Sequence, residues 1–181
     1  MVQAADCPFC LIVAGRAPVS RVYEDAWALA FMDTNPVRRG HLLVIPKAHR
    51  AQIWEMGPVE FARVYRCLPT LVRALATAVG ADAVNVLSLN GPAGGQTVFH
   101  LHFHLIPIHR GRPALRRHGR RVALEFVQRP AARPELDRVA ARIRNAVRHA
   151  RQRHPSVRRG GRMVTRCQRS KTGRLPARST A

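Results

Sequence analysis

Apolar residues recur along the first 110 positions with two periods, one typical of strands and one typical of helices. A helical pattern covers residues 8–14 and ends at Gly15. A second one covers residues 58–80, where Pro69 predicts a kink because proline removes one backbone donor. The patterns of strands, both alternating and continuously apolar, lie at residues 22–24, 27–32, 41–46, 83–89 and 98–107.

The C-terminal part has a weaker pattern. Apolar residues at helical spacing predict an amphipathic helix that begins near Pro134. From about residue 155 the chain is rich in Arg, Gly and Ser and has few large apolar residues, which predicts disorder. We therefore divide the chain into a compact domain at residues 1–110, a basic segment with an amphipathic helix at 111–154, and an Arg-rich tail at 155–181.

The positive charge lies almost entirely in the C-terminal third. The whole chain of 181 residues has a formal net charge of +21. Residues 1–110 carry 10 Lys+Arg and 7 Asp+Glu, giving +3, whereas residues 111–181 carry 21 and 3, giving +18. A basic segment of this size attracts phosphate polymers and acidic surfaces, so nonspecific contact with nucleic acid or an acidic partner is one expectation. A solvated extension without a specific partner is the other.

The expected compartment affects how the cysteines are interpreted. The first residues lack the basic start and apolar run of a signal peptide, and no apolar run is long enough to span a membrane. These absences predict a cytoplasmic protein without membrane contact. In that reducing setting, the pair Cys7 and Cys10 favours metal or redox chemistry over a disulfide.

Three histidines at alternate positions, His100, His102 and His104, are the strongest functional signal. On a strand they would share one face, with apolar residues between them on the other. The loop at 94–97 would present backbone N–H groups to a phosphate, and an imidazole can attack phosphorus to give a covalent phospho-histidine. A metal-binding double-stranded β-helix is the competing interpretation. It usually has a nearby carboxylate, and residues 103–112 contain none.

Residues 100–106 match the motif His-φ-His-φ-His-φ-φ, where φ is apolar, at every position. With the blocks at 7–10, 22–25, 30–33, 40–49 and 94–98, they resemble the histidine triad (HIT) proteins, in particular a bacterial HIT-like branch with Cys-x-x-Cys. The resemblance implies that residues 1–110 form the HIT domain. It also implies an α+β fold in which an antiparallel sheet packs with a long helix and a short N-terminal helix, assembled as a two-fold homodimer.

The resemblance further implies a nucleotide hydrolase or nucleotidyl transferase. It would act at the α-phosphate of nucleoside phosphoramidates or dinucleoside polyphosphates, through a covalent nucleotidyl-histidine and without a redox cofactor. His102 would be the nucleophile. The other implied catalytic residues are His104, His100, His41 and Thr97. The implied contacts to a purine nucleotide are Asp33, Asn90, Gln96, Thr97, Phe9 and Ile12.

Two alternatives remain beside these roles. The chain could be a nucleotide-binding or regulatory protein of the same fold, with weak or no hydrolysis. Asp33, which the resemblance places at the ribose hydroxyls, could instead cap the turn before Pro36.

The Cys-x-x-Cys pair implies a structural zinc ion. Tetrahedral zinc takes four ligands, so two cysteines need two further partners. By resemblance to bacterial HIT proteins, the four ligands are Cys7, Cys10, His49 and His100. Two free thiols beside a short helix are the alternative. If His100 binds zinc, its part in catalysis is structural.

Overall fold

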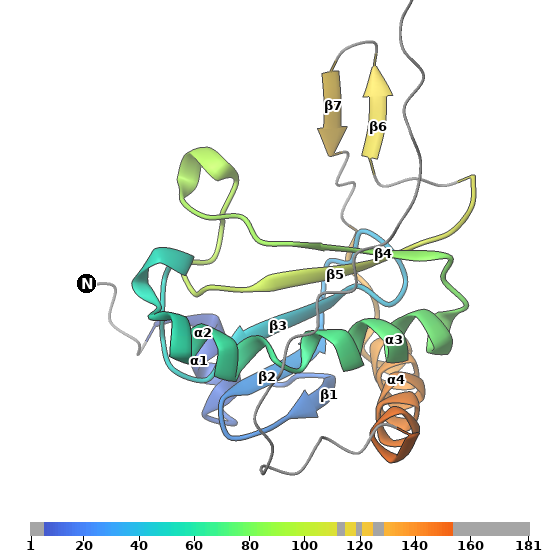
Figure 1. The fold of residues 1–181 in the computed structure, drawn as a ribbon, viewed down its shortest axis with the longest axis horizontal. Helices are drawn as coiled ribbons and strands as arrows, with labels where there is room; N and C mark the ends of the chain where they lie inside the picture. Colours follow the sequence, from blue (N-terminus) through green and yellow to red (C-terminus); the bar gives the residue numbers. More distant parts are fainter. Residues whose placement is uncertain (1–5, 112–114, 119–120, 125–128, 154–181) are drawn as a thin grey trace, which may run out of the picture.

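The computed structural model describes residues 6–111, 115–118, 121–124 and 129–153. It contains a five-stranded antiparallel sheet with the strand order β1-β2-β3-β5-β4 and a separate two-stranded pair, β6-β7 (Figure 1). The strands are β1 (Arg21–Glu24), β2 (Ala28–Met32), β3 (Leu42–Pro46), β4 (Ala83–Leu87), β5 (Phe103–Ile108), β6 (Leu115–His118) and β7 (Arg121–Leu124). The helices are α1 (Pro8–Val13), α2 (Pro58–Tyr65), α3 (Leu68–Val79) and α4 (Arg133–Arg153), with the 3-10 turns η1 (Ile53–Glu55) and η2 (Pro92–Gly94).

Helices cover both faces of the sheet, and the two faces have separate hydrophobic clusters. In β2 and β3 every residue is buried, and successive side chains point to opposite faces. Ala30 and Val44 belong to the larger cluster with α2, α3 and α4. Phe31 and Leu43 belong to the smaller cluster with Phe9 of α1. The short helix α1 therefore forms its own layer on the face opposite α3 and α4.

The predicted helix over residues 58–80 is two helices, so the prediction of one kinked helix was wrong. The chain leaves α2 after Tyr65, and Cys67 is the N-cap of α3. Pro69 therefore lies in the first turn of α3, where its missing N–H has no helical partner to lose. Proline here begins a helix and does not bend one.

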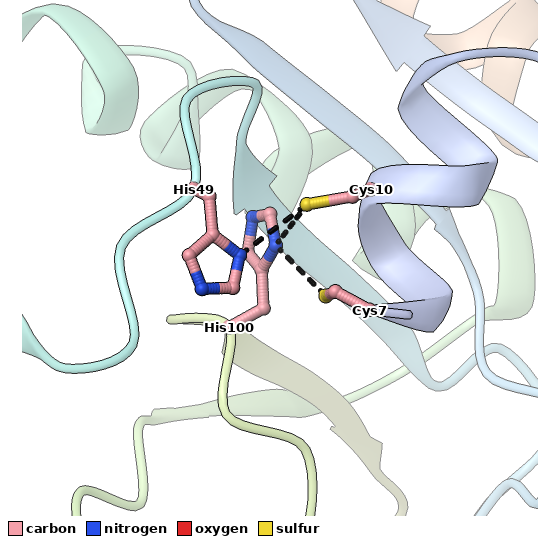
Figure 2. A group of neighbouring side chains, drawn as sticks. All are labelled: Cys7, Cys10, His49 and His100. Carbon is pink, nitrogen blue, oxygen red and sulfur yellow. Dashed lines mark hydrogen bonds between the residues drawn. The ribbon is translucent and has the colours of Figure 1, made fainter. Parts of the chain in front are cut away.

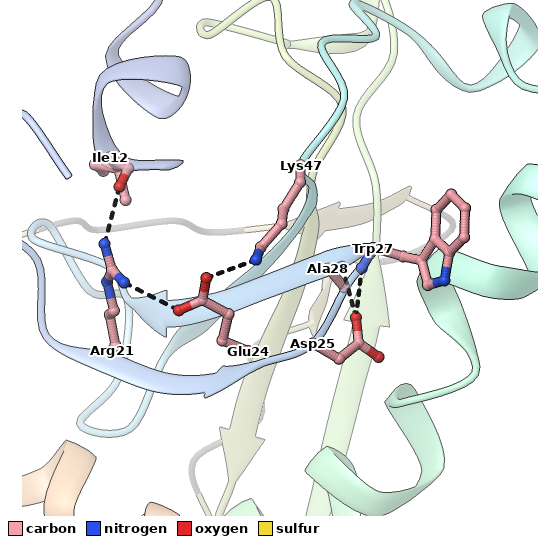
Figure 3. A network of polar contacts seen from close by, with 7 residues as sticks. All are labelled: Ile12, Arg21, Glu24, Asp25, Trp27, Ala28 and Lys47. Carbon is pink, nitrogen blue, oxygen red and sulfur yellow. Dashed lines mark hydrogen bonds and ion pairs between the residues drawn. The ribbon is translucent and has the colours of Figure 1, made fainter. Parts of the chain in front are cut away.

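The turn between β1 and β2 depends on Asp25 (Figure 3). The backbone N–H groups of Trp27 and Ala28 both donate to its Oδ1 at 2.8 Å. Burial would raise the pKa of Asp25, but these bonds and the hydroxyl bond from Tyr23 hold it below its ordinary value. The carboxylate thus closes the turn that aligns β1 with β2.

A second group in Figure 3 ties α1 to the edge of the sheet. Arg21 donates to the Ile12 carbonyl at 3.2 Å and to Glu24 at 3.0 Å. Lys47 lies 2.6 Å from the other Glu24 oxygen, and its hydrogen bond is the main reason that the pKa of Glu24 is lowered. The C-terminal end of α1 is therefore held against β1 by a chain of polar contacts.

The histidine strand begins later than the predicted residues 98–107. Residues 98–102 are irregular, and only His104 of the three histidines lies within β5. His104 pairs with Leu43 of β3 in the antiparallel register. Leu101 and Leu105 point into the larger hydrophobic cluster, with Phe103 packed against it. The apolar half of the alternation thus behaves as predicted, while the irregular backbone lets His100 turn away from the other two.

Helix α4 is the amphipathic helix expected near Pro134, and it packs beside α3 (Figure 1). Its apolar residues, among them Leu136, Val139 and Ile143, share the larger cluster with the sheet.

The sheet and the helices together confirm the predicted antiparallel α+β fold. The domain division at residue 110, the two-fold dimer and the cytoplasmic setting stay predictions. The tail at 155–181 lies outside the described residues. Within them, no helix is long and apolar enough to span a membrane.

Gly40, just before β3, provides a test of this packing. Its φ is +99°, and a Cβ there would lie 3.1 Å from Val79 Cγ1 and 3.3 Å from both Leu75 Cδ1 and Pro107 Cγ. We expect Gly40→Ala to lower the free energy of unfolding by about 3 kcal/mol, through backbone strain and overpacking together. Urea denaturation measures this change.

Gly15 is the matched control. It also has a positive φ, +72°, but apart from its chain neighbours no described atom lies within 4 Å of the place that a Cβ would take. Gly15→Ala should therefore lower the free energy of unfolding only through backbone strain, by about 1 kcal/mol. Equal losses in the two variants would contradict close packing at Gly40.

Candidate active site

A cavity of about 310 Å³ opens on the face of the sheet that α1 covers. Side chains from α1, the segment before β1, β2 and the turn after it, β3, the irregular segment before β5, β5 itself and the start of α4 line it. They are Pro8, Phe9, Ile12, Pro18, Val19, Phe31, Met32, Asp33, Thr34, Asn35, Leu43, Thr97, Val98, His102, His104 and Arg133. The His102 and His104 rings, 4.8 Å apart between centroids, and the Thr97 hydroxyl form what we call the polar end, and the mainly apolar side chains of α1, β2 and β3 form what we call the apolar end. This combination suits a ligand with an apolar ring at one end and a polar group at the other.

His102 is buried at the polar end with a defined protonation pattern. Its Nδ1 lies 2.7 Å from the backbone carbonyl of His100. A carbonyl can only accept, so Nδ1 carries the proton and Nε2 keeps its lone pair. Burial lowers the pKa of His102 below its ordinary value, which favours the neutral ring. The edge of the Phe9 ring packs against the imidazole, with the ring centroids 5.4 Å apart.

His41 and His104 form a hydrogen-bonded pair behind His102. The backbone N–H of Val37 donates to His41 Nδ1 at 3.3 Å, so the His41 proton is on Nε2. His41 Nε2 then donates to His104 Nδ1 at 2.9 Å, which leaves the His104 proton on Nε2. His104 Nε2 is buried and has no hydrogen-bond partner among the described residues. The ring of His104 lines the cavity, so this unpartnered N–H is available to a ligand.

Burial keeps these two histidines neutral. It lowers the pKa of His41 to about 4 and that of His104 to about 3, with the charge of His102 adding to both shifts. Near pH 7 the polar end of the cavity therefore holds uncharged imidazoles. One of them offers a lone pair, and its neighbour offers an N–H.

Asp33 has two contacts that bear on its predicted roles. Its Oδ1 accepts the Asn35 N–H at 2.8 Å, which is the turn cap considered from the sequence. Its Oδ2 lies 3.4 Å from His41 Nδ1, a contact that becomes an ion pair only if His41 is protonated. The residue also lines the cavity. Capping the turn and facing a ligand are therefore compatible.

Of the other predicted phosphate contacts, Thr97 lines the cavity, whereas Gln96 and Asn90 do not. Gln96 is buried, donates to the carbonyls of Ala51 and Val98, and accepts the Gly91 N–H. Asn90 accepts the Ile53 N–H and donates to Ser88. Both amides thus hold the loops that precede Thr97, and their predicted contacts with a phosphate stay predictions.

Four potential metal ligands meet beside the cavity (Figure 2). Cys7 and Cys10 come from the start of α1, His49 from the segment after β3, and His100 from the segment before β5. Their ligand atoms all lie within 4.8 Å of one another. His100 Nδ1 is 3.4 Å from Cys7 Sγ and 3.5 Å from Cys10 Sγ, and His49 Nδ1 is 3.3 Å from Cys10 Sγ. Sulfur and nitrogen ligands of one tetrahedral zinc lie about 3.5 Å apart.

The surroundings of the cluster also fit a zinc ion. His100 Nε2 donates to the Pro46 carbonyl at 2.9 Å, so Nδ1 is the nitrogen left to bind. Burial, and next the hydrogen bond and charge of Cys7, raise the pKa of the Cys10 thiol to about 11. A cation would reverse this preference and stabilise the thiolates. His100 does not line the cavity, because both of its nitrogens face other partners.

Asp33, His41 and His104 form a second group with ligand atoms close together. The 2.9 Å between His41 Nε2 and His104 Nδ1 is a hydrogen-bond distance, and their remaining contacts follow one consistent set of protons. We therefore interpret this group as a hydrogen-bonded pair of imidazoles beside a carboxylate.

Sequence reasoning missed several cavity residues. Phe31 and Leu43 could have been found, because alternation in β2 and β3 places them on the same face as Phe9. Val19 and Val98 are partly buried and pack against that cluster. Arg133 carries no local signal, since it comes from the C-terminal helix α4, far along the chain from the other residues of the cavity wall.

Comparisons with known proteins agree with this geometry. Residues 14–111 match the family model described as the HIT domain. The chain is 42% identical over 102 residues to adenylylsulfatase HINT3 from Arabidopsis thaliana, a match that covers 56% of this chain and 52% of the plant protein. It is 44% identical over 101 residues to adenosine 5'-monophosphoramidase hnt1 from Schizosaccharomyces pombe, covering 56% and 73% of the two chains. The match thus spans about half of the plant protein.

A solved structure shares the wider fold. The zinc-bound histidine triad family protein from Mycobacterium smegmatis superimposes with a TM-score of 0.67 at 31% identity, covering 83% of this chain and 99% of that one. The family model, the identity to curated relatives and the shared fold all point the same way. This chain belongs to the histidine triad family.

Proposed function

We propose that this protein is a nucleotide hydrolase or nucleotidyl transferase, and that His102 Nε2 attacks the α-phosphorus of a nucleoside phosphoramidate or dinucleoside polyphosphate. The observation that carries the proposal is the hydrogen bond from His102 Nδ1 to the His100 carbonyl. It leaves the Nε2 lone pair of a neutral imidazole at the polar end of the cavity, beside the His104 N–H. Two relatives are an adenosine 5'-monophosphoramidase and an adenylylsulfatase, which supports substrates with an adenylyl group.

The reaction would proceed in two displacements. Bond formation between His102 Nε2 and phosphorus breaks the bond to the leaving group, which takes a proton from the His104 Nε2–H or from water as it departs. Water then attacks the nucleotidyl-histidine, the P–Nε2 bond breaks and Nε2 regains its lone pair, while the proton that water loses replaces the one the leaving group took. Another acceptor in place of water would make the reaction a transfer. The His104 N–H and the Thr97 hydroxyl would donate to phosphate oxygens or to the leaving atom.

The rest of the nucleotide would occupy the apolar end of the cavity. Phe9, Ile12 and Phe31 would contact a purine, while Asp33 would face the ribose hydroxyls. Phe9 also packs against His102, so the base and the phosphorus would be placed relative to one helix.

We also propose that Cys7, Cys10, His49 and His100 hold a structural zinc ion. The donor atoms are close enough for one tetrahedral ion, and the related mycobacterial structure is zinc-bound. Bound zinc would fix α1 against the rest of the domain. Because Phe9 and Ile12 of this helix line the cavity, the ion would hold the base-binding wall in place without contacting the substrate.

The nucleophile can be tested directly. We expect the wild-type protein to hydrolyse adenosine 5'-phosphoramidate, and His102→Ala to lower kcat by about 10⁴-fold. The substitution removes the only group in the proposal that bonds to phosphorus. An enzyme assay with purified protein measures both rates, and mass spectrometry after a rapid quench should detect an adenylyl adduct in the wild type alone.

His109→Ala is the control, because His109 follows β5 and does not line the cavity. It should keep the wild-type kcat within about twofold, as surface positions away from a site usually do. Turnover of neither phosphoramidates nor dinucleoside polyphosphates by the wild type would contradict an enzyme and favour a binding or regulatory protein.

The zinc proposal has its own readout. The purified protein should hold close to one zinc ion per chain by elemental analysis, and Cys10→Ser should hold much less. Loss of zinc should lower the unfolding midpoint by about 10 °C, which corresponds to about 3 kcal/mol for a chain of this size. Cys67→Ala is the control, since Cys67 donates to Val64 and lies outside the cluster. Equal zinc content in all three proteins would refute the site.

Burial of the neutral imidazoles predicts a pH dependence of stability. His41 has a folded pKa of about 4, against an unfolded value of about 6.5. The unfolded chain therefore binds more protons between these values, so the free energy of unfolding falls as the pH drops from about 6.5 toward 4. Chemical denaturation at several pH values measures this change. In His41→Gln the free energy of unfolding should fall less steeply with decreasing pH than in the wild type, by up to about 1.4 kcal/mol per pH unit. Identical pH dependence in both proteins would show that His41 does not contribute.

A further inference from the structure

Arg133 stands apart from the rest of the cavity wall. It is in the first turn of α4, outside residues 14–111 that match the family model, yet it lines the same cavity as His102 and Phe9. It is also the single Lys or Arg side chain among the described residues that line this cavity. Apart from Arg133 and the α1 residues Pro8, Phe9 and Ile12, every lining residue lies within 14–111, so α4 adds a cation to a site formed by the family domain and α1.

The guanidinium is held in place by the segment before β1. Arg133 donates to Ser20 Oγ at 3.1 Å and to the Pro18 carbonyl at 3.3 Å. Ser20 in turn donates to Asp137 one turn farther along α4 at 2.6 Å. Pro18 and its neighbour Val19 also line the cavity, so these bonds hold Arg133 beside that part of the wall.

The charge of Arg133 has no carboxylate partner among the described residues. Glu135, on the same turn, pairs with Arg39 at 3.5 Å, and Asp137 Oδ1 accepts the Ser20 hydroxyl. The bonds to Ser20 and Pro18 go to neutral oxygens. The planar group therefore retains both a net charge and unused N–H donors at the cavity wall.

We propose that Arg133 contacts the nucleobase and thereby raises the affinity of the site for nucleotides. This inference rests on the proposed function, since it takes the polar end of the cavity to bind the phosphate. A guanidinium stacks on aromatic rings and donates to acceptors such as purine N7. Among the described residues, Arg133 contacts Ser20 and Pro18 and makes no hydrogen bond to His102 or His104, so we expect it to act on binding and not on the chemical step.

Calorimetric titration with two ligands tests this role. AMP and ribose 5-phosphate share the sugar and the phosphate, and only AMP has a base. Arg133→Gln should weaken AMP binding by about tenfold, the scale of one lost stacking contact, and change the binding of ribose 5-phosphate by less than about twofold. Arg133→Lys keeps the charge but lacks the planar fork, so it should lose most of the same affinity.

Arg39→Gln is the matched control. It removes an exposed arginine that contacts the first turn of α4 and lies outside the cavity. Its AMP affinity should equal that of the wild type, and circular dichroism checks that all variants are folded. If Arg133→Gln weakened the binding of both ligands equally, the effect would be one of charge in general, and the base contact would be overturned. Unchanged AMP binding in Arg133→Gln would also overturn it. So would wild-type AMP affinity in Arg133→Lys.

Failure of the proposed function is distinguishable from failure of this inference. Wild-type protein that binds AMP but turns over neither class of substrate would overturn the enzyme and leave the Arg133 measurement valid. Wild-type protein that does not bind AMP would overturn the role of Arg133. In an active enzyme, Arg133→Gln should raise KM for the phosphoramidate with kcat within about twofold of wild type.

Discussion

One short backbone segment connects the two sites in this structure. The side chain of His100 lies with the cysteines of α1, and its Nε2 is fixed by the Pro46 carbonyl at the end of β3. Its own carbonyl accepts a hydrogen bond from His102 Nδ1. The tautomer of the proposed nucleophile thus depends on how residue 100 is held. A regular strand would not give this arrangement, because His100 and His102 would then face the same way.

Helix α1 has a similar double attachment. Its cysteines belong to the metal-ligand cluster, while Phe9 and Ile12 form part of the cavity wall. With only six residues, α1 is too short to be stable by itself. Its position depends on the cysteine cluster at one end and on the bond from Arg21 to the Ile12 carbonyl at the other. The shape of the apolar end of the cavity therefore depends on contacts outside the cavity itself.

The sequence alone predicted most of the fold, because the apolar periods are clear and glycine or proline marks the ends of several elements. The resemblance placed Phe9, Ile12, Asp33, Thr97 and two of the three histidines around what the structure shows to be one cavity. The register of the histidines was less predictable. Alternating apolar and polar residues predict which side chains share a face only where the backbone is extended. The contacts that turn the His100 side chain come from residues distant in sequence. Arg133 could not be predicted at all, since its place depends on the packing of α4.

The alternation of β2 and β3 has a consequence for how this protein can diverge. Phe31 and Leu43 face the cavity, whereas their neighbours Ala30 and Val44 face α3 and α4. Substitutions at the first two positions can reshape the pocket while the second two preserve the helical side of the core. A change of ligand can therefore begin on the cavity face without altering the packing against α3 and α4. In each of these two strands, one residue faces the cavity and can vary with the ligand, and the adjacent residue packs against the helices and holds the fold.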